Sequence, residues 1–231
     1  MKITDFGVAV VESDSHLSKW VQEQRRLDVQ DEFCQLFKQY IPTGGVVIDV
    51  GACIGDHTLS YAKMVGPSGT VFAFEPNKEA YSCLHHNMLP WKNVVRLWMA
   101  LGAKNSTGES VPSKTEPENL GAVSILESEH GDIKIRALDD LCQFTPRIDF
   151  IKIDAEGSEP DIIAGAMQTL ARLKPVLLVE INRPLLAERG KCANDIILPL
   201  VSLGYTVQPS EAHLSMDLPQ LDVLCLPGEL K

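Results

Sequence analysis

Short apolar runs alternate with stretches of helical periodicity along most of the chain. Residues 46–50 form the first run, and such a β-branched segment is typical of a strand buried on both faces of a parallel sheet. The other runs predict strands over residues 70–74, 94–100, 149–154 and 175–181, and the periodic stretches predict helices over about 28–40, 56–65, 77–89, 159–172 and 192–203. This β-α-β alternation predicts an α/β fold with a parallel sheet and right-handed crossovers.

Three regions depart from this alternation. Residues 205–208 and 221–226 predict two final strands, and the short polar loop between them has no room for a helix, so we expect a hairpin. Residues 103–132 are polar and contain Gly, Ser and Pro, which predicts an insertion or loop with a short strand at 123–126. Residues 1–42 are expected to form an N-terminal helical extension.

A glycine-rich segment directly follows the first strand. Gly51 permits a tight turn, and Gly55 lets the next helix approach closely, so that a ligand can lie against backbone N–H groups. The spacing is G-x-x-x-G, and Cys53 stands near the place where a dinucleotide loop has a glycine that admits a pyrophosphate. A compact amino-acid end fits better, and Asp49 suits its ammonium group. The alternative is a structural turn without a ligand.

Glu75 ends the second strand, about 20 residues after the glycine segment, and Pro76 follows it. Rossmann-type folds place an acid here because one carboxylate can accept hydrogen bonds from both ribose hydroxyls. The alternative is a solvated acid in a turn. Paired with the glycine segment, Glu75 is interpreted as a ribose ligand.

Asp154 and Glu156 lie at the carboxyl end of a central strand, where open α/β sheets bind ligands. These carboxylates could orient a substrate hydroxyl, help to remove its proton, or hold a divalent cation. The alternative is helix capping, which we assign to Glu159, whereas Asp154 is interpreted as functional and Glu156 stays open. Glu180, at the end of the fifth strand, is a candidate for the wall of the acceptor pocket.

The composition limits which binding partners and which cellular compartment we expect. The net charge of -10 and the scattered basic residues argue against a nucleic-acid partner. The sequence shows no signal peptide and no apolar stretch of membrane-spanning length, so we expect a cytoplasmic protein without a membrane partner. The six cysteines form no C-x-x-C, and no histidine stands at zinc-ligand spacing, so no metal ligand is assigned.

With no repeat or linker, residues 1–231 are expected to form a single domain. His57 is expected to position neighbours rather than to act as a base.

The ordered motifs resemble the FkbM family of S-adenosylmethionine-dependent methyltransferases. They are Asp49-x-Gly51-Ala52-x-x-Gly55-x-x-Thr58, Phe74-Glu75-Pro76, Ala100-Leu101-Gly102, Leu138-Asp139-Asp140 and Ile151-Lys152-Ile153-Asp154-x-Glu156-Gly157-x-Glu159. The resemblance covers about residues 40–185, and the Ile-Lys-Ile-Asp-x-Glu-Gly stretch is its most specific part. Two departures are Cys53, where the family usually has Asn, and Ala155, where it often has Val.

The resemblance implies a three-layer, Rossmann-like class I methyltransferase fold. Its seven-stranded sheet is mostly parallel with a reversed C-terminal strand, and helices cover both faces. The cofactor would be S-adenosyl-L-methionine, with S-adenosyl-L-homocysteine as product. The implied cofactor-binding residues are Asp49, Gly51, Ala52, Gly55, Thr58, Glu75, Pro76 and Ala100. Asp154 would lie near the sulfonium and the acceptor, so Asp154 and Glu156 are the candidate catalytic residues.

The expected activity is O-methylation of a hydroxyl on a small-molecule, sugar or polyketide-like acceptor. A sulfonium methyl is already activated, so positioning is the main task and a carboxylate base assists. The alternatives are an NAD-dependent oxidoreductase and a non-catalytic module that binds the cofactor; an RNA methyltransferase is disfavoured by charge. The acceptor and the oligomeric state stay open.

Overall fold

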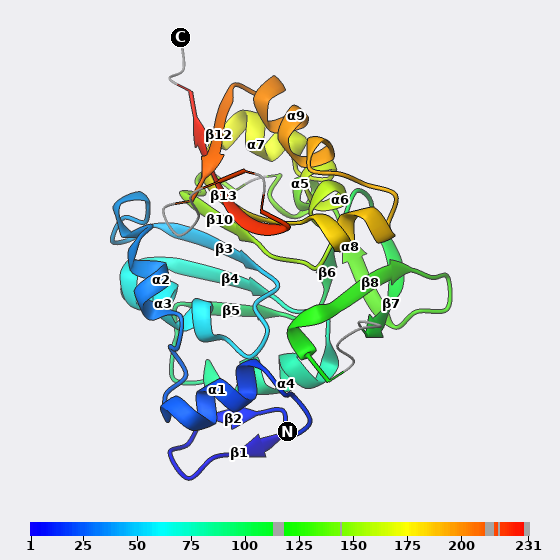
Figure 1. Ribbon diagram of the computed structural model, residues 1–231. Helices are drawn as coiled ribbons and strands as arrows, with labels where there is room; N and C mark the ends of the chain where they lie inside the picture. Colours follow the sequence, from blue (N-terminus) through cyan, green and yellow to red (C-terminus); the bar gives the residue numbers. More distant parts are fainter. Residues whose placement is uncertain (113–117, 144, 211–214, 217, 229–231) are drawn as a thin grey trace.

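A seven-stranded sheet forms the centre of the computed structural model, which describes residues 1–112, 118–143, 145–210, 215–216 and 218–228 (Figure 1). Its order is β12-β13-β11-β10-β3-β4-β5. The strands are β12 (Tyr205–Pro209), β13 (Gln220–Pro227), β11 (Val176–Asn182), β10 (Phe150–Ile153), β3 (Val46–Val50), β4 (Thr70–Phe74) and β5 (Val94–Leu97). All neighbours pair in parallel except β13, which is antiparallel to β11 and β12. The predicted terminal hairpin and reversed strand are therefore confirmed.

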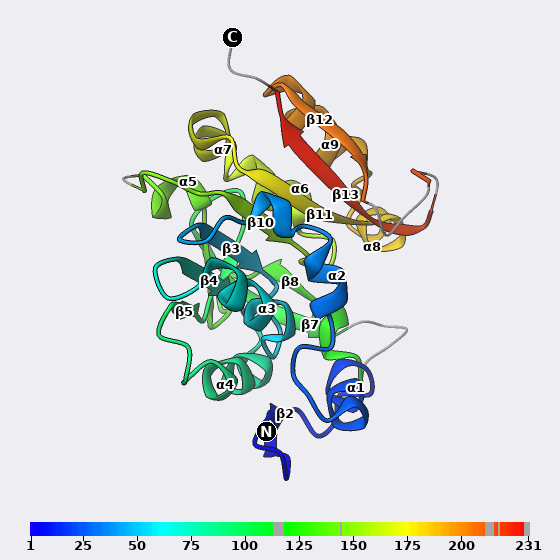
Figure 2. The same cartoon turned by 90° about the vertical axis from the view of Figure 1, so that its left-hand side faces the viewer.

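Helices cover both faces of this sheet, as the two views show (Figures 1 and 2). Adjacent residues of β3 face opposite cores, because Val47 belongs to one buried cluster and Ile48 to the other. The first cluster packs against α2 (Asp31–Gln35), α3 (Asp56–Val65) and α4 (Lys78–Asn87); the second packs against α6 (Glu159–Ala164), α7 (Met167–Leu173) and α9 (Asn194–Ser202). The predicted three-layer fold is confirmed.

The strand order fixes where a ligand can lie. β3 pairs with β4 on one side and with β10 on the other, although about 100 residues separate β3 from β10 in sequence. The strand order therefore reverses at β3: the chain continues from β3 to β4 on one side and later returns to β10 on the other side. A crevice is usual at the carboxyl edge of the sheet at such a switch point, and here the cavity is lined by residues that follow β3, β4 and β10.

The polar insertion is more ordered than expected. β7 (Ser106–Pro112) and β8 (Val123–Glu127) pair antiparallel, and with β6 (Ala100–Leu101) and β9 (Ile133–Arg136) they make a four-stranded sheet. The short strand predicted at 123–126 is confirmed, whereas residues 113–117 lie outside the described part. The predicted strand 94–100 is wrong at its end, because β5 stops at Leu97 and Ala100 joins this second sheet.

Some predicted helices are broken. The helix expected over 28–40 divides into α2 and a 3-10 turn at Lys38–Tyr40, and the N-terminal region also contains β1 (Lys2–Ile3), β2 (Ala9–Val10) and α1 (Leu17–Gln24). The helix expected over 159–172 is interrupted at Gly165, where an added Cβ would lie 2.0 Å from the Gly102 carbonyl oxygen. α5 (Leu138–Leu141) and α8 (Arg183–Glu188) were not predicted.

Among the described residues, no helix has the length and apolar character needed to cross a membrane.

Candidate active site

The main cavity opens at the carboxyl edge of the sheet, between the ends of β3, β4 and β10. Of the predicted site residues, Gly51, Glu75, Pro76, Ala100, Asp154 and Glu156 line it. Asp49, Ala52, Gly55 and Thr58 do not line it. The site therefore has a lining layer and a supporting layer, and sequence motifs alone do not separate the two.

Gly51 forms the floor of the cavity and has a φ of 81°. A Cβ at this position would lie 1.8 Å from the backbone carbonyl oxygen of Asp154, so only glycine lets the ends of β3 and β10 come together. Cys53, two residues later, has a φ of 47°. This left-handed conformation favours Asn among non-glycine residues, which gives a physical reason for the family preference at this position.

Asp49 lies beneath the floor, fully buried at the end of β3. Its Oδ2 accepts a 2.5 Å hydrogen bond from the Thr58 hydroxyl, and its Oδ1 has no partner among the described residues. Burial raises the pKa of Asp49, while Lys152 and Thr58 oppose that rise. Asp49 thus ties the strand to α3 from below, and its predicted contact with an ammonium group stays a prediction.

Glu75 closes the β4 side of the cavity. Its Oε2 accepts from the Cys53 N–H at 2.8 Å, and its Oε1 accepts from the Asn77 N–H at 2.7 Å. Burial raises the pKa of Glu75 to about 7, and the two N–H groups oppose the rise. The carboxylate is held rigidly at the cavity wall beside Pro76, which is where the ribose role was predicted.

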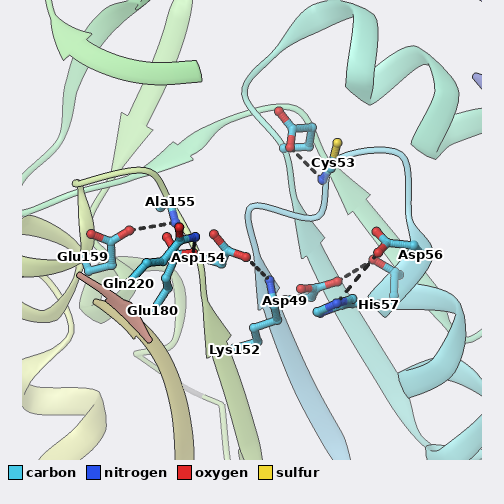
Figure 3. A network of polar contacts seen from close by, with 12 residues as sticks. Asp49, Cys53, Asp56, His57, Lys152, Asp154, Ala155, Glu159, Glu180 and Gln220 are labelled. Atoms are coloured by element: carbon cyan, nitrogen blue, oxygen red, sulfur yellow. Dashed lines mark hydrogen bonds and ion pairs between the residues drawn. The ribbon is translucent and has the colours of Figure 1, made fainter. Parts of the chain in front are cut away.

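Lys152 is the residue that sequence reasoning passed over. It lies inside β10, opposite Asp49 in the register, and is 4% exposed. Its Nζ donates to Asp154 Oδ2 at 2.9 Å (Figure 3). Burial opposes the charge, but Asp154, Asp49 and Asp56 outweigh it and raise the pKa of Lys152. A lysine within an otherwise apolar central strand was the available signal, because a buried charge needs a partner.

Asp56 and His57 open α3 at the edge of the same cavity. Burial raises the pKa of Asp56 to about 7. Burial, with the charge of Lys152 added, lowers the pKa of His57 well below its usual value, so the ring is neutral. The His57 ring lies 5.7 Å from that of Phe33, centroid to centroid. This packing suits the positioning role expected of His57.

Asp154 and Glu156, which line the cavity after β10, form an acidic cluster with Glu180, which lies within β11 and is not among the residues that line the cavity, so its place at the acceptor wall stays a prediction. One carboxylate oxygen from each lies within 4.8 Å of the others. Glu180 Oε1 accepts from the Gln220 side chain at 2.6 Å, and burial, with the charges of Asp154 and Glu156 added, raises the pKa of Glu180 well above its usual value. Glu156 has a φ of 50°, a strained conformation for a glutamate.

Glu159 has a structural role, but its side chain supports the loop before α6 instead of capping the helix, whose N-cap residue Ser158 makes no side-chain cap hydrogen bond. Its Oε1 accepts from the N–H groups of Ala155 at 2.9 Å and Gly157 at 3.2 Å, so it fastens the loop that carries Asp154 to the start of α6 (Figure 3). Burial raises the pKa of Glu159 to about 7.

The outer wall of the cavity comes from segments without motifs. Leu17 and Gln30 reach it from the N-terminal region, and Leu120, Gly121 and Val123 reach it from the insertion. The Ser124 hydroxyl of β8 donates to the Glu156 carbonyl oxygen at 2.9 Å, which anchors the inserted sheet to the loop after β10. Segments far apart in the sequence therefore enclose the carboxylates.

The fold and this crevice define the class of protein. The strand order and the reversed strand are those of class I S-adenosylmethionine-dependent methyltransferases. The Methylobacillus flagellatus FkbM methyltransferase superposes with a TM-score of 0.50 at 16% identity, over 79% of this chain and 43% of that one. Aeropyrum pernix fibrillarin, solved with bound S-adenosyl-L-methionine, superposes with a TM-score of 0.52 at 12% identity, over 84% of this chain and 74% of that one.

The family follows from the sequence. The family model described as the methyltransferase FkbM domain matches residues 49–207, so the chain belongs to the FkbM methyltransferase family. The predicted family and cofactor class are confirmed.

Two curated methyltransferases are also similar in sequence to this chain. The 2-O-methyltransferase NoeI of Sinorhizobium fredii is 26% identical over 147 residues, and the hexuronic acid methyltransferase AglP of Haloferax volcanii is 27% identical over 163 residues. The alignments cover 56% and 68% of this chain, and they span only 60% and 64% of the relatives.

Proposed function

We propose that the chain transfers the methyl group of S-adenosylmethionine to a hydroxyl oxygen of a sugar-like acceptor. The observation that carries this proposal is the position of Asp154, which follows a central strand, lines the cavity, and contacts Gly51 through its backbone. The candidate base and the candidate cofactor loop are thus in direct contact. The names of the two relatives, a 2-O-methyltransferase and a hexuronic acid methyltransferase, support the choice of acceptor.

The donor set fits the cofactor. Gly51 leaves bare backbone at the cavity floor, and the Glu75 carboxylate is aligned by two N–H groups while its oxygens keep further acceptor capacity for ribose hydroxyls. Acidic side chains outnumber basic ones in the lining, where Lys152 is the one Lys or Arg of the described residues, and this favours a cationic sulfonium. When bound, S-adenosylmethionine supplies an electrophilic methyl group.

The protein's own part is to position the acceptor and to accept a proton. Asp154 is the proposed base, and the Lys152 ammonium holds its Oδ2 in a fixed orientation at 2.9 Å. A second carboxylate, Glu156, lines the same wall and is the other candidate. The acceptor would lie under the segments around Leu17 and Leu120, whose apolar side chains exclude water from the reacting oxygen.

The alternatives receive less support. An NAD-dependent oxidoreductase would need a loop open to a pyrophosphate, but the Cys53 N–H is already bonded to Glu75, and the family is that of methyltransferases. A non-catalytic module would have no need for a lysine buried against the candidate base. A sugar is favoured over a polyketide-like acceptor by the relatives and by the carboxylates on the wall.

Methyl transfer from labelled S-adenosylmethionine to a panel of sugars, uronic acids and polyketide-like alcohols tests the proposal. We expect methylation of a sugar hydroxyl, identified by mass spectrometry and NMR. Asp154→Asn should abolish most of the transfer. The matched control is Asp132→Asn, which removes the charge of an exposed aspartate of the insertion. Transfer only to nitrogen, or full turnover in Asp154→Asn, would contradict the proposal.

A further inference from the structure

We propose that the carboxylates of Asp154, Glu156 and Glu180 bind a divalent cation, Mg²⁺ or Mn²⁺, and that this cation holds two adjacent oxygens of the methyl acceptor. The claim that the cation holds the acceptor rests on the proposed function. The claim that the three carboxylates bind a cation rests on the side chains alone. The carboxylates come from neighbouring strands: Ile153, the last residue of β10, pairs with Val179 of β11, so Asp154, directly after β10, lies beside Glu180, which is still within β11.

The separation of the oxygens fits one ion. A carboxylate oxygen from each residue lies within 4.8 Å of the others. Oxygen ligands lie about 2.0–2.6 Å from Mg²⁺ or Ca²⁺, so two ligands of one ion are at most about 4–5 Å apart. The three oxygens therefore need little movement to share a cation. All are hard carboxylate donors without a thiolate or an imidazole, which selects Mg²⁺, Mn²⁺ or Ca²⁺ over zinc.

An independent observation points to a missing partner. Glu180 is 8% exposed, and its Oε2 is buried without a hydrogen-bond partner among the described residues. Gln220 satisfies only the other oxygen, Oε1. An unpartnered buried carboxylate oxygen is costly, and here it lies in a group of three acids. Lys152 is bonded to Asp154, so it does not satisfy this oxygen of Glu180. A divalent cation would satisfy the free Glu180 oxygen.

The site defines an acceptor class. Three carboxylate ligands leave open positions on a cation that prefers six oxygens. A vicinal diol, or a hydroxyl beside a carboxylate, fills two such positions and forms a chelate. The cation would favour loss of the proton from the bound hydroxyl, and Asp154, which also lines the cavity, is placed to receive it. Acceptors with an isolated hydroxyl should therefore be poor substrates.

Binding of Mn²⁺ to the full chain tests the site directly. Loss of the free Mn²⁺ signal in electron paramagnetic resonance, with and without S-adenosylhomocysteine, should show one saturable site per chain that Mg²⁺ displaces. Glu180→Gln should weaken Mn²⁺ binding at least about tenfold. This variant keeps the oxygen that accepts from Gln220, so it should remain folded by circular dichroism. The matched control is Glu188→Gln, an exposed glutamate on α8, which should bind Mn²⁺ as the unmodified chain does.

Each result separates the cation site from the proposed function. Absence of saturable Mn²⁺ binding, or equal binding in Glu180→Gln and Glu188→Gln, overturns the site and leaves Glu180 as a buried acid that keeps a proton. Methyl transfer that persists in EDTA together with absent binding overturns the site but not the transfer. Saturable binding lost in Glu180→Gln supports the site even if no tested alcohol is methylated, in which case the proposed function fails alone.

Discussion

The cavity has two halves that use carboxylates differently. In the half after β3 and β4, which we call the glycine half (Gly51, Cys53 and Glu75), the carboxylate of Glu75 is bonded to two backbone N–H groups. In the half after β10, which we call the carboxylate half (Asp154, Glu156 and the adjacent Glu180, which does not line the cavity), three carboxylates lie together, and Lys152 is bonded to Asp154. Both Glu75 oxygens accept hydrogen bonds, whereas Glu180 Oε2 has no hydrogen-bond partner among the described residues.

The difference in how the carboxylates are bonded indicates a different role for each half of the cavity. A half whose polar groups are already satisfied presents a fixed shape, which suits a ligand that every reaction cycle shares. A half in which a buried carboxylate oxygen has no partner among the described residues is more stable when a proton, a cation or a substrate satisfies that oxygen. We therefore assign the cofactor to the glycine half and the chemistry on the acceptor to the carboxylate half.

The largest effect is expected from Gly51→Ala, which changes the residue at the backbone contact between Gly51 of the glycine half and Asp154 of the carboxylate half. The new Cβ would lie 1.8 Å from the Asp154 carbonyl oxygen, so β3 and β10 must separate. We expect a loss of several kcal/mol of unfolding free energy, about 3 or more, and no cofactor binding. The control is Gly204→Ala, whose φ of 84° is similar and whose Cβ would meet nothing within 4 Å, so only about 1 kcal/mol should be lost. Equal losses in urea unfolding would contradict the steric account.

The next effect is expected from Asp154→Asn in the carboxylate half. Removal of the proposed base should lower kcat about a hundredfold or more, because general bases contribute about 10²–10⁴-fold. Affinity for S-adenosylhomocysteine should change less than about threefold, since Asp154 is assigned to the other half. Steady-state kinetics and calorimetry measure the two quantities. A large loss of affinity with little change in kcat would reverse the assignment of the halves.

A smaller effect is expected from Glu75→Gln in the glycine half. The amide keeps the shape but weakens the acceptor for ribose hydroxyls, and a hydrogen bond to a charged group is worth about 1.5–3 kcal/mol. Calorimetry should therefore show about tenfold to a hundredfold weaker binding of S-adenosylhomocysteine. Glu79→Gln, at an exposed position on α4, is the matched control. Unchanged affinity in Glu75→Gln would remove Glu75 from the cofactor site.

The smallest effect is expected from pH. Burial raises the pKa values of Glu75 and Asp56 to about 7, so both carry protons in part of the unliganded protein at neutral pH. A cationic ligand prefers the ionised carboxylates, so its binding releases protons and its affinity increases with pH. We expect affinity for S-adenosylmethionine to rise about fivefold between about pH 6 and pH 8. Glu75→Gln should flatten this rise, and affinity that falls with pH would contradict the sign.

Periodicity and motif spacing were enough to predict the large sheet, since buried parallel strands such as 46–50 are continuous apolar runs. They were not enough for the second sheet. Its strands, such as β7, are polar and partly exposed, so their order comes from pairing with each other rather than from burial. The break at Gly165 also depends on the close backbone of Gly102, a contact between distant residues that no local pattern contains.

The site was predicted in part for the same reason. Gly51, Glu75 and Asp154 follow strand ends, and strand ends in a parallel sheet meet at one edge. Glu180 was expected at the acceptor wall, but its cluster with Asp154 and Glu156 depends on strand order, which motifs do not contain. Asp49 and Thr58 belong to the motif but lie below the cavity. The motif contains both residues that line the cavity and residues that support them, and its spacing does not distinguish the two groups.

The most direct test of the two-half account is calorimetric titration of the unmodified chain, Glu75→Gln and Asp154→Asn with S-adenosylhomocysteine, with NAD as a control ligand. The account predicts micromolar binding to the unmodified chain, about -8 kcal/mol, no binding of NAD, weaker binding to Glu75→Gln, and nearly unchanged binding to Asp154→Asn. Binding of NAD, or a greater loss in Asp154→Asn than in Glu75→Gln, would contradict it.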